Sequence, residues 1–191
     1  LAAGEVASSV SFLVVIYNPG QDVDLVGLLR SPLIGFTEQE LADIRLVDRK
    51  VSYYDALLAA RADFPKVEAF LQRLDFLREF ACDQPVYRLL WEIYDETGAL
   101  GLYGALPNGA QRQSNLLAFF ERARAFEGQG FRGLFAFVRL LRGMQETGED
   151  FQPVGAEQTG GAVRIMSIHK SKGPELPDVV WGARDKQVND A

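Results

Sequence analysis

A turn near the carboxyl end of the chain holds the side chains best suited to chemistry. It reads His169-Lys170-Ser171-Lys172-Gly173-Pro174-Glu175. Lysine and histidine can meet phosphates, glycine permits close approach of the backbone, and a carboxylate can accept a hydrogen bond from a ribose hydroxyl. The composition of this turn is also typical of a solvated loop, so the order of its residues and the elements around it must decide between the two interpretations.

Two short apolar segments flank this turn and must position it. Residues 163–168 alternate polar and apolar side chains with β-branched residues, and residues 179–181 form a short apolar run. Both patterns predict strands. Because ligands bind at the carboxyl ends of strands in open α/β sheets, we expect a short C-terminal β segment, residues 163–191, from the edge of an α/β domain.

The earlier part of the chain carries helix signals at short intervals. Apolar residues at helical spacing up to Tyr17 predict a first helix, which Asn18-Pro19-Gly20 ends. The expected starts of the next helices are Asp22 as a cap, Thr37 with Glu40 as a capping box, Ser52 with Asp55, and first-turn prolines at Pro65 and Pro85.

Two further helices are expected after a loop from Gly101 to Gly109. Their predicted apolar faces hold Leu116, Leu117, Phe120, Ala123 and Phe126, and then Phe131, Leu134, Phe135, Val138 and Leu141. The sequence therefore predicts a mainly α fold, a helical bundle over residues 1–146. Residues 147–162 are polar and rich in glycine, which predicts a linker.

Composition excludes several classes of function. The net charge is -6, so any DNA contact must be local. The only cysteine, Cys82, lies in an apolar helical context and is expected to be buried or half-buried, and it cannot form a zinc site alone. No apolar run is long enough to cross a membrane. The sequence has no G-x-x-x-x-G-K-[ST] pattern, so a complete P-loop ATPase is excluded.

The order of residues around the turn resembles helicase motif V of the UvrD/Rep-like superfamily 1 proteins. The matching stretch is Val163-Arg164-Ile165-Met166-Ser167-Ile168-His169-Lys170-Ser171-Lys172-Gly173-Pro174-Glu175-Leu176-Pro177. Three positions depart from the usual motif: Ser167 replaces threonine, Pro174 replaces leucine and Leu176 replaces phenylalanine. Pro174 is the largest change, because it removes a backbone N–H and restricts Gly173 before it.

Two stretches upstream narrow the resemblance to the AddA-type helicase/nuclease subunits. The first joins Asn18-Pro19 and Asp22 to Leu28-Leu29-Arg30-Ser31-Pro32 and Gly35-Phe36, and the second is Gly109-x-x-Arg112-Gln113-x-Asn115-Leu116. In that family the helical region is the 2B accessory domain, and motif V marks the return into the RecA-like 2A domain. The resemblance therefore implies a 2B-like domain over residues 1–146 and the start of a RecA-like 2A segment over residues 163–191.

The resemblance also implies roles for single residues of the motif. Ser167 and His169 would contact the DNA backbone, with Lys170 and Lys172 assisting electrostatically. Gly173 would allow close packing of the loop, and Glu175 would contact the nucleotide sugar. No complete catalytic site and no metal site are expected within these 191 residues.

The function implied is that of a fragment of a bacterial, cytoplasmic, ATP-dependent DNA helicase and nuclease that processes double-strand ends. The parent protein would use ATP and Mg2+, bind duplex ends and single strands of DNA, and pair with an AddB-like partner. The fragment alone is expected to bind neither cofactor and to lack ATPase activity. Two alternatives stay open: a UvrD/Rep-type helicase without a nuclease, and a non-catalytic helical module that binds protein or DNA.

Overall fold

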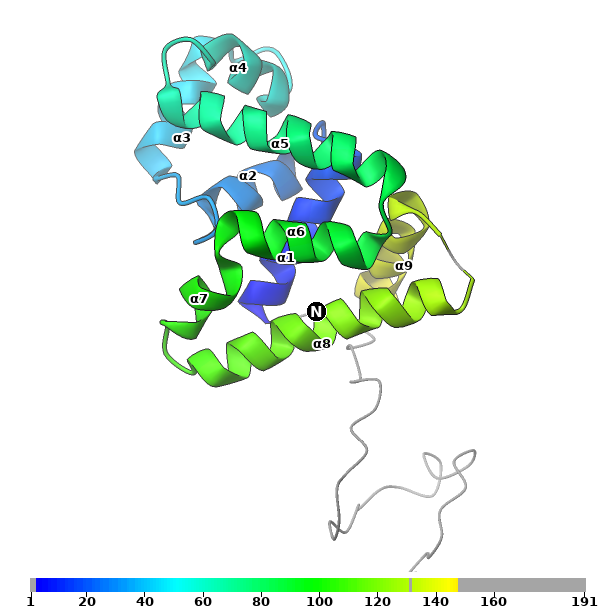
Figure 1. Ribbon diagram of the computed structural model, residues 1–191. Helices are drawn as coiled ribbons and strands as arrows, with labels where there is room; N and C mark the ends of the chain where they lie inside the picture. Colours follow the sequence, from blue (N-terminus) through cyan, green and yellow to red (C-terminus); the bar gives the residue numbers. More distant parts are fainter. Residues whose placement is uncertain (1–2, 131, 148–191) are drawn as a thin grey trace, which may run out of the picture. The chain divides into compact units, whose positions relative to one another are not determined.

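A helix that is apolar on nearly every side lies at the centre of the fold. The computed structural model describes residues 3–130 and 132–147, and in it α1 (Gly4–Tyr17) buries five consecutive residues, from Phe12 to Ile16. A helix that is apolar all round must be covered on all sides. α1 contacts α2, α5, α6, α8 and α9, and Figure 1 shows it crossing behind α6.

The next three helices are short, and their starts test the capping signals. They are α2 (Asp22–Arg30), α3 (Glu38–Val47) and α4 (Tyr53–Ala60). Thr37 and Glu40 form the expected capping box, and the Ser52 side chain accepts from the backbone N–H of Asp55. These predictions are confirmed.

Asp22 is not the cap that the sequence predicts. The cap position of α2 belongs to Gln21, and Asp22 is the first helical residue. Its Oδ1 instead accepts from the backbone N–H of Tyr53, 3.0 Å away, at the start of α4. The carboxylate therefore satisfies a free donor of a different helix, which sequence spacing alone cannot show.

Three longer helices form the near side of the molecule in Figure 1: α5 (Pro65–Asp83), α6 (Val86–Thr97) and α8 (Gly109–Gly128). Pro65 occupies the first turn of α5 as predicted. Pro85 stands one residue earlier than expected, at the cap position of α6. The backbone N–H of Val86 donates to Glu127 Oε1 at 2.8 Å, so a side chain from the far end of α8 completes the start of α6.

The predicted loop from Gly101 to Gly109 is wrong in its first half. α7 (Ala99–Gly104) forms there, directly after Gly98 ends α6 in the left-handed conformation. Ala99 and Tyr103 are buried, and α7 contacts both α6 and α8. Burial of these side chains outweighs the low helix propensity of the two glycines in α7.

The buried faces of α8 and of α9 (Leu134–Thr147) differ from the predicted ones by one or two positions. Phe119 is 2% exposed, whereas Leu117 is 43% exposed and Phe120 is only partly buried. In α9, Phe137 is fully buried and Phe135 is 57% exposed. Both helices therefore turn a face toward the core that includes one aromatic residue absent from the prediction.

The mainly α class is confirmed, because nine helices and no strand form within the described residues. The predicted linker and the predicted C-terminal β segment lie outside the described residues, apart from Thr147 at the end of α9. Within the described part of the chain, no helix is long and apolar enough to cross a membrane.

Candidate functional site

The six predicted site residues lie outside the described residues. They are Ser167, His169, Lys170, Lys172, Gly173 and Glu175. The structure does describe the two upstream stretches that carry the narrower resemblance. Each of them builds a polar anchor between helices that are distant in the sequence.

The first stretch forms a tight corner after α2. The buried Ser31 hydroxyl donates to the carbonyl of Leu28 at 2.6 Å, and the backbone N–H of Phe36 donates to the carbonyl of Leu29 at 2.8 Å. Gly35 adopts a φ of 75°, which a residue without a side chain reaches at no steric cost. The corner reverses the chain so that α3 can begin at Glu38.

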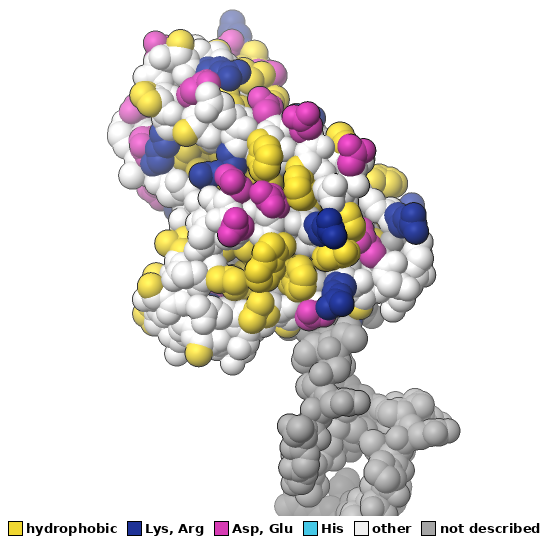
Figure 2. Space-filling model, viewed as in Figure 1, with side chains coloured by type: hydrophobic (Ala, Val, Ile, Leu, Met, Phe, Trp, Pro, Cys, Tyr) yellow, Lys and Arg dark blue, Asp and Glu magenta, His cyan; other side chains and the backbone are white. Residues whose placement is uncertain are grey.

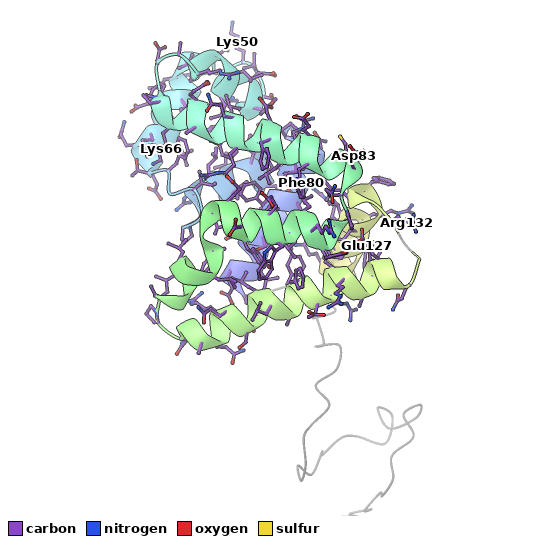
Figure 3. The ribbon with its side chains drawn as sticks, in the orientation of Figure 1. Lys50, Lys66, Phe80, Asp83, Glu127 and Arg132 are labelled. Carbon is purple, nitrogen blue, oxygen red and sulfur yellow. The ribbon has the colours of Figure 1, made fainter. Side chains whose placement is uncertain are left out.

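Lys66, at the start of α5, binds this corner through its ammonium group (Figure 3). Its Nζ donates to the Gly35 carbonyl at 2.7 Å and to Glu40 Oε2 at 2.9 Å, and it lies 4.5 Å from the centre of the Phe36 ring. The hydrogen bond from the Thr37 backbone, together with Lys66, lowers the pKa of Glu40 to about 2. The capping box of α3 and the anchor to α5 therefore share one carboxylate.

The second stretch binds a buried carboxylate on α1. Glu5 is 2% exposed, and its two oxygens accept from Arg112 Nη1 and Asn115 Nδ2, each at 2.7 Å. Burial alone would raise the pKa of Glu5, but the hydrogen bonds from Asn115, its own backbone and Arg112 outweigh it and lower the pKa. This cluster joins the first turn of α1 to the first turns of α8.

The turn before α8 is held by close backbone packing. Asn108 has a φ of 60°, and a Cβ on Gly109 would collide with the backbone carbonyl of Gly104. Arg112 Nε donates back to the carbonyl of Pro107 at 3.0 Å, and Gln113 Nε2 donates to the carbonyl of Leu100 at 2.9 Å. The glycine of this stretch therefore permits a contact that no other residue type could make.

The described residues offer no set of groups for metal chemistry. No cluster of three or more His, Cys, Asp or Glu side chains forms among them. Cys82 is exposed, contrary to the expectation of burial, because it lies on the outer side of the last turn of α5.

Sequence reasoning missed Glu5 and Lys66, the two charged residues that complete these anchors. Glu5 lies 107 residues from Arg112 along the chain, and Lys66 lies 31 residues from Gly35. The only local signal for Glu5 or Lys66 is a charged residue next to an apolar helical stripe. A charged side chain in solvent gives the same pattern.

An aromatic surface lies over α6 and α8 on the face drawn in Figure 2. Trp91 is 46% exposed, and its ring packs edge to face on Phe120 with centroids 5.3 Å apart. Tyr87 contacts the same ring at 6.1 Å. Exposed aromatic clusters of this kind are enriched in protein interfaces.

No protein-family model matches the chain. Curated proteins do match it over nearly its whole length. An Oceanobacillus iheyensis protein is 43% identical over 97% of this chain, a Bacillus velezensis protein 42% over 98%, and an Acetivibrio thermocellus protein 42% over 97%. All three carry the name of the A-type (AddA) subunit of an ATP-dependent helicase/nuclease.

These relatives are much longer than the 191 residues of this chain. The chain spans 16% of the length of the first two and 15% of the third. The matches include both anchored stretches and the motif V stretch, because they cover almost every residue. The chain belongs to the AddA family of ATP-dependent helicase/nuclease subunits, of which it represents one segment.

Proposed function

We propose that this chain serves as one segment of an ATP-dependent DNA helicase and nuclease that processes double-strand ends. The match at 43% identity over 97% of the chain to an AddA-type helicase/nuclease carries this proposal. The name of that relative includes a nuclease, which argues against the alternative of a UvrD/Rep-type helicase without one.

Within that protein, residues 1–146 act as the helical 2B-like accessory domain. The support is the all-helical architecture of the described residues and the absence of a P-loop pattern from the sequence. One anchor joins α3 to α5 and the other joins α1 to α8. Such cross-links suit an accessory domain that moves as a unit when the motor domains close.

Residues 163–176 couple DNA to the nucleotide site. Ser167 and His169 contact the DNA backbone, assisted by Lys170 and Lys172. Gly173 and Glu175 lie at the nucleotide, with Glu175 on the sugar. The proposal for these residues is supported by their order in the sequence and by the match that covers them.

The parent protein uses ATP with Mg2+, pairs with an AddB-like partner and acts in the bacterial cytoplasm. The word "subunit" in the relatives' names supports a multisubunit assembly.

A chimaera tests the proposal. Residues 1–191 replace the matching segment of the Oceanobacillus iheyensis relative, and DNA-stimulated ATP hydrolysis and unwinding are measured. We expect both activities to survive. We expect His169→Ala to weaken the stimulation by DNA about tenfold, and Glu175→Ala to raise the KM for ATP, as removal of one contact to a bound group commonly does.

The matched control is Gln187→Ala, which lies outside the motif and should leave both activities unchanged. A folded chimaera that neither hydrolyses ATP nor unwinds DNA would overturn the proposal. The isolated chain should show no hydrolysis above its Glu175→Ala variant, since it holds only part of the motor.

A further inference from the structure

A groove lies between the end of α1 and the outer side of α9. Its volume is about 380 Å³, and Tyr17, Asn18 and Gln21 line one wall while Phe135, Arg139 and Arg142 line the other. The last three residues are spaced by four and three positions, which places them on one side of α9. We call this the α1–α9 groove.

Two aromatic rings are accessible in the α1–α9 groove. The rings of Tyr17 and Phe135 lie 5.6 Å apart between centroids and are inclined by 39°. The two residues remain 45% and 57% exposed. Phe135 contributes little to the core, so its exposed ring in the groove offers a contact surface to a ligand with an apolar face.

Two arginines and one carboxylate line the groove, Arg139, Arg142 and Glu146, in a chain of net charge -6. The charge of Arg142 is balanced by Asp24, whose Oδ2 lies 3.1 Å from Arg142 Nη2. Arg139 makes no ion pair with any described residue, so its guanidinium is available to an anion. Figure 3 shows Arg132 in the turn that leads into α9.

Aromatic rings beside an available guanidinium form the kind of site that binds unpaired nucleotides. Bases of single-stranded DNA stack on exposed rings, and arginine contacts the phosphates between them. In a duplex the base faces are already stacked on one another, so the rings would have no partner. The volume falls in the range of small-ligand pockets, roughly 300–1,000 Å³, which suits one or two nucleotides.

We propose that the α1–α9 groove binds single-stranded DNA, with Phe135 stacking on a base and Arg139 contacting a phosphate. The inference rests on the proposed function, because that function supplies the single strand as a product of unwinding. It adds a contact surface on the helical part of the chain that is separate in sequence from motif V.

The test is a fluorescence anisotropy titration of the 191-residue chain with a labelled oligothymidine and with a duplex of equal length. Arg139→Gln and Phe135→Leu are compared with matched controls, Arg49→Gln and Phe76→Leu, which change exposed residues far from the groove in sequence. Circular dichroism confirms that each variant folds.

We expect Phe135→Leu to weaken binding of the single strand about tenfold. Arg139→Gln should weaken it about fivefold and reduce the slope of log affinity against log salt by about 0.7, as loss of one phosphate contact on a single strand predicts. Both controls should bind like the parent chain, and the duplex should bind more weakly.

Equal affinity of the groove variants and their controls would overturn the proposal, as would tighter binding to the duplex or no binding at about 50 mM salt. If His169→Ala alone abolishes binding, the groove proposal fails and the motif V proposal stands. If the chimaera is inactive while Arg139→Gln still weakens binding of the isolated chain, the helicase proposal fails and the groove stands.

Discussion

Arg112 Nη1 lies 2.7 Å from Glu5 Oε2, although 107 residues separate the two along the chain. The Glu5 carboxylate is buried and Arg112 is one-third exposed, so the pair joins the inside of α1 to the surface of α8. Because Asn115 donates to the other oxygen, the carboxylate has a partner on each side. A buried charge of this kind is costly to leave without its partners.

Arg112→Ala should therefore destabilise the chain more than loss of an exposed arginine. Partial exposure screens the pair, so we expect a loss of about 1–3 kcal/mol in the free energy of unfolding. Urea denaturation measures it. The control is Arg30→Ala, whose pair with Glu38 is exposed on both sides and should cost below about 1 kcal/mol. Equal losses in the two variants would show that the buried pair stabilises the fold no more than an exposed pair does.

Acid should weaken the fold through two carboxyls. The pKa of Glu5 is lowered in the folded chain, and the pKa of Glu40 is lowered from 4.5 to about 2. A lowered pKa means that the stabilisation is complete above the unfolded value and is lost as the pH falls through the folded value. We expect the free energy of unfolding to fall between about pH 5 and about pH 2.

Glu40→Gln should flatten this dependence on pH, because the variant has no carboxyl to protonate at the capping box. Denaturation at a series of pH values checks the result. A steep acid dependence that persists unchanged in Glu40→Gln would assign it to other groups, with Glu5→Gln as the next variant to compare.

Gly109→Ala should destabilise the turn before α8. The added methyl group would meet the backbone carbonyl of Gly104, which cannot move as a side chain can. We expect a loss of about 1–3 kcal/mol. Gly27→Ala is the matched control, since it lies within α2 with open space around it and should gain up to about 1 kcal/mol from helix propensity. Thermal denaturation of both variants separates the two effects.

Phe119→Ala should cost far more stability than Phe120→Ala. Phe119 is 2% exposed and packs on Phe137, with centroids 6.0 Å apart, whereas Phe120 lies at the surface against Trp91. We expect about 3–5 kcal/mol for the first and about 1–2 kcal/mol for the second. The order would reverse if α8 turned the predicted face toward the core, so chemical denaturation of the pair tests the rotation of this helix.

Local signals predicted where most helices begin, because a cap is made by residues three positions apart. Thr37 with Glu40, and Ser52 with Asp55, form the expected bonds. Asp22 carries the same signal and serves another helix. The partner of each side chain depends on which backbone N–H lies nearest in the folded structure, and the sequence alone does not show that distance.

The rotation of α8 and the existence of α7 also depend on partners far along the chain. Leu117 and Phe120 fit a helical stripe as well as Phe119 does, and contact with Phe137 decides between them. α7 forms because Tyr103 is buried against its neighbours. For the candidate site, residue order singled out both anchored stretches, but it could not reveal Glu5 or Lys66. The motif V assignment stays a prediction, because its residues lie outside the described ones.

The central place of α1 has a consequence for synthesis in the cell. α1, with its five consecutive apolar residues, is covered on all its sides only when α8 and α9 have been made, since both contact it. The ribosome synthesises these residues long before Leu134, so the nascent chain exposes the apolar surface of α1 to solvent until α9 is made. Contacts between α1 and α9 join residues far apart in the sequence, and such contacts form slowly. This segment should therefore depend on chaperones during translation, and shortening α9 should lower its yield in cells.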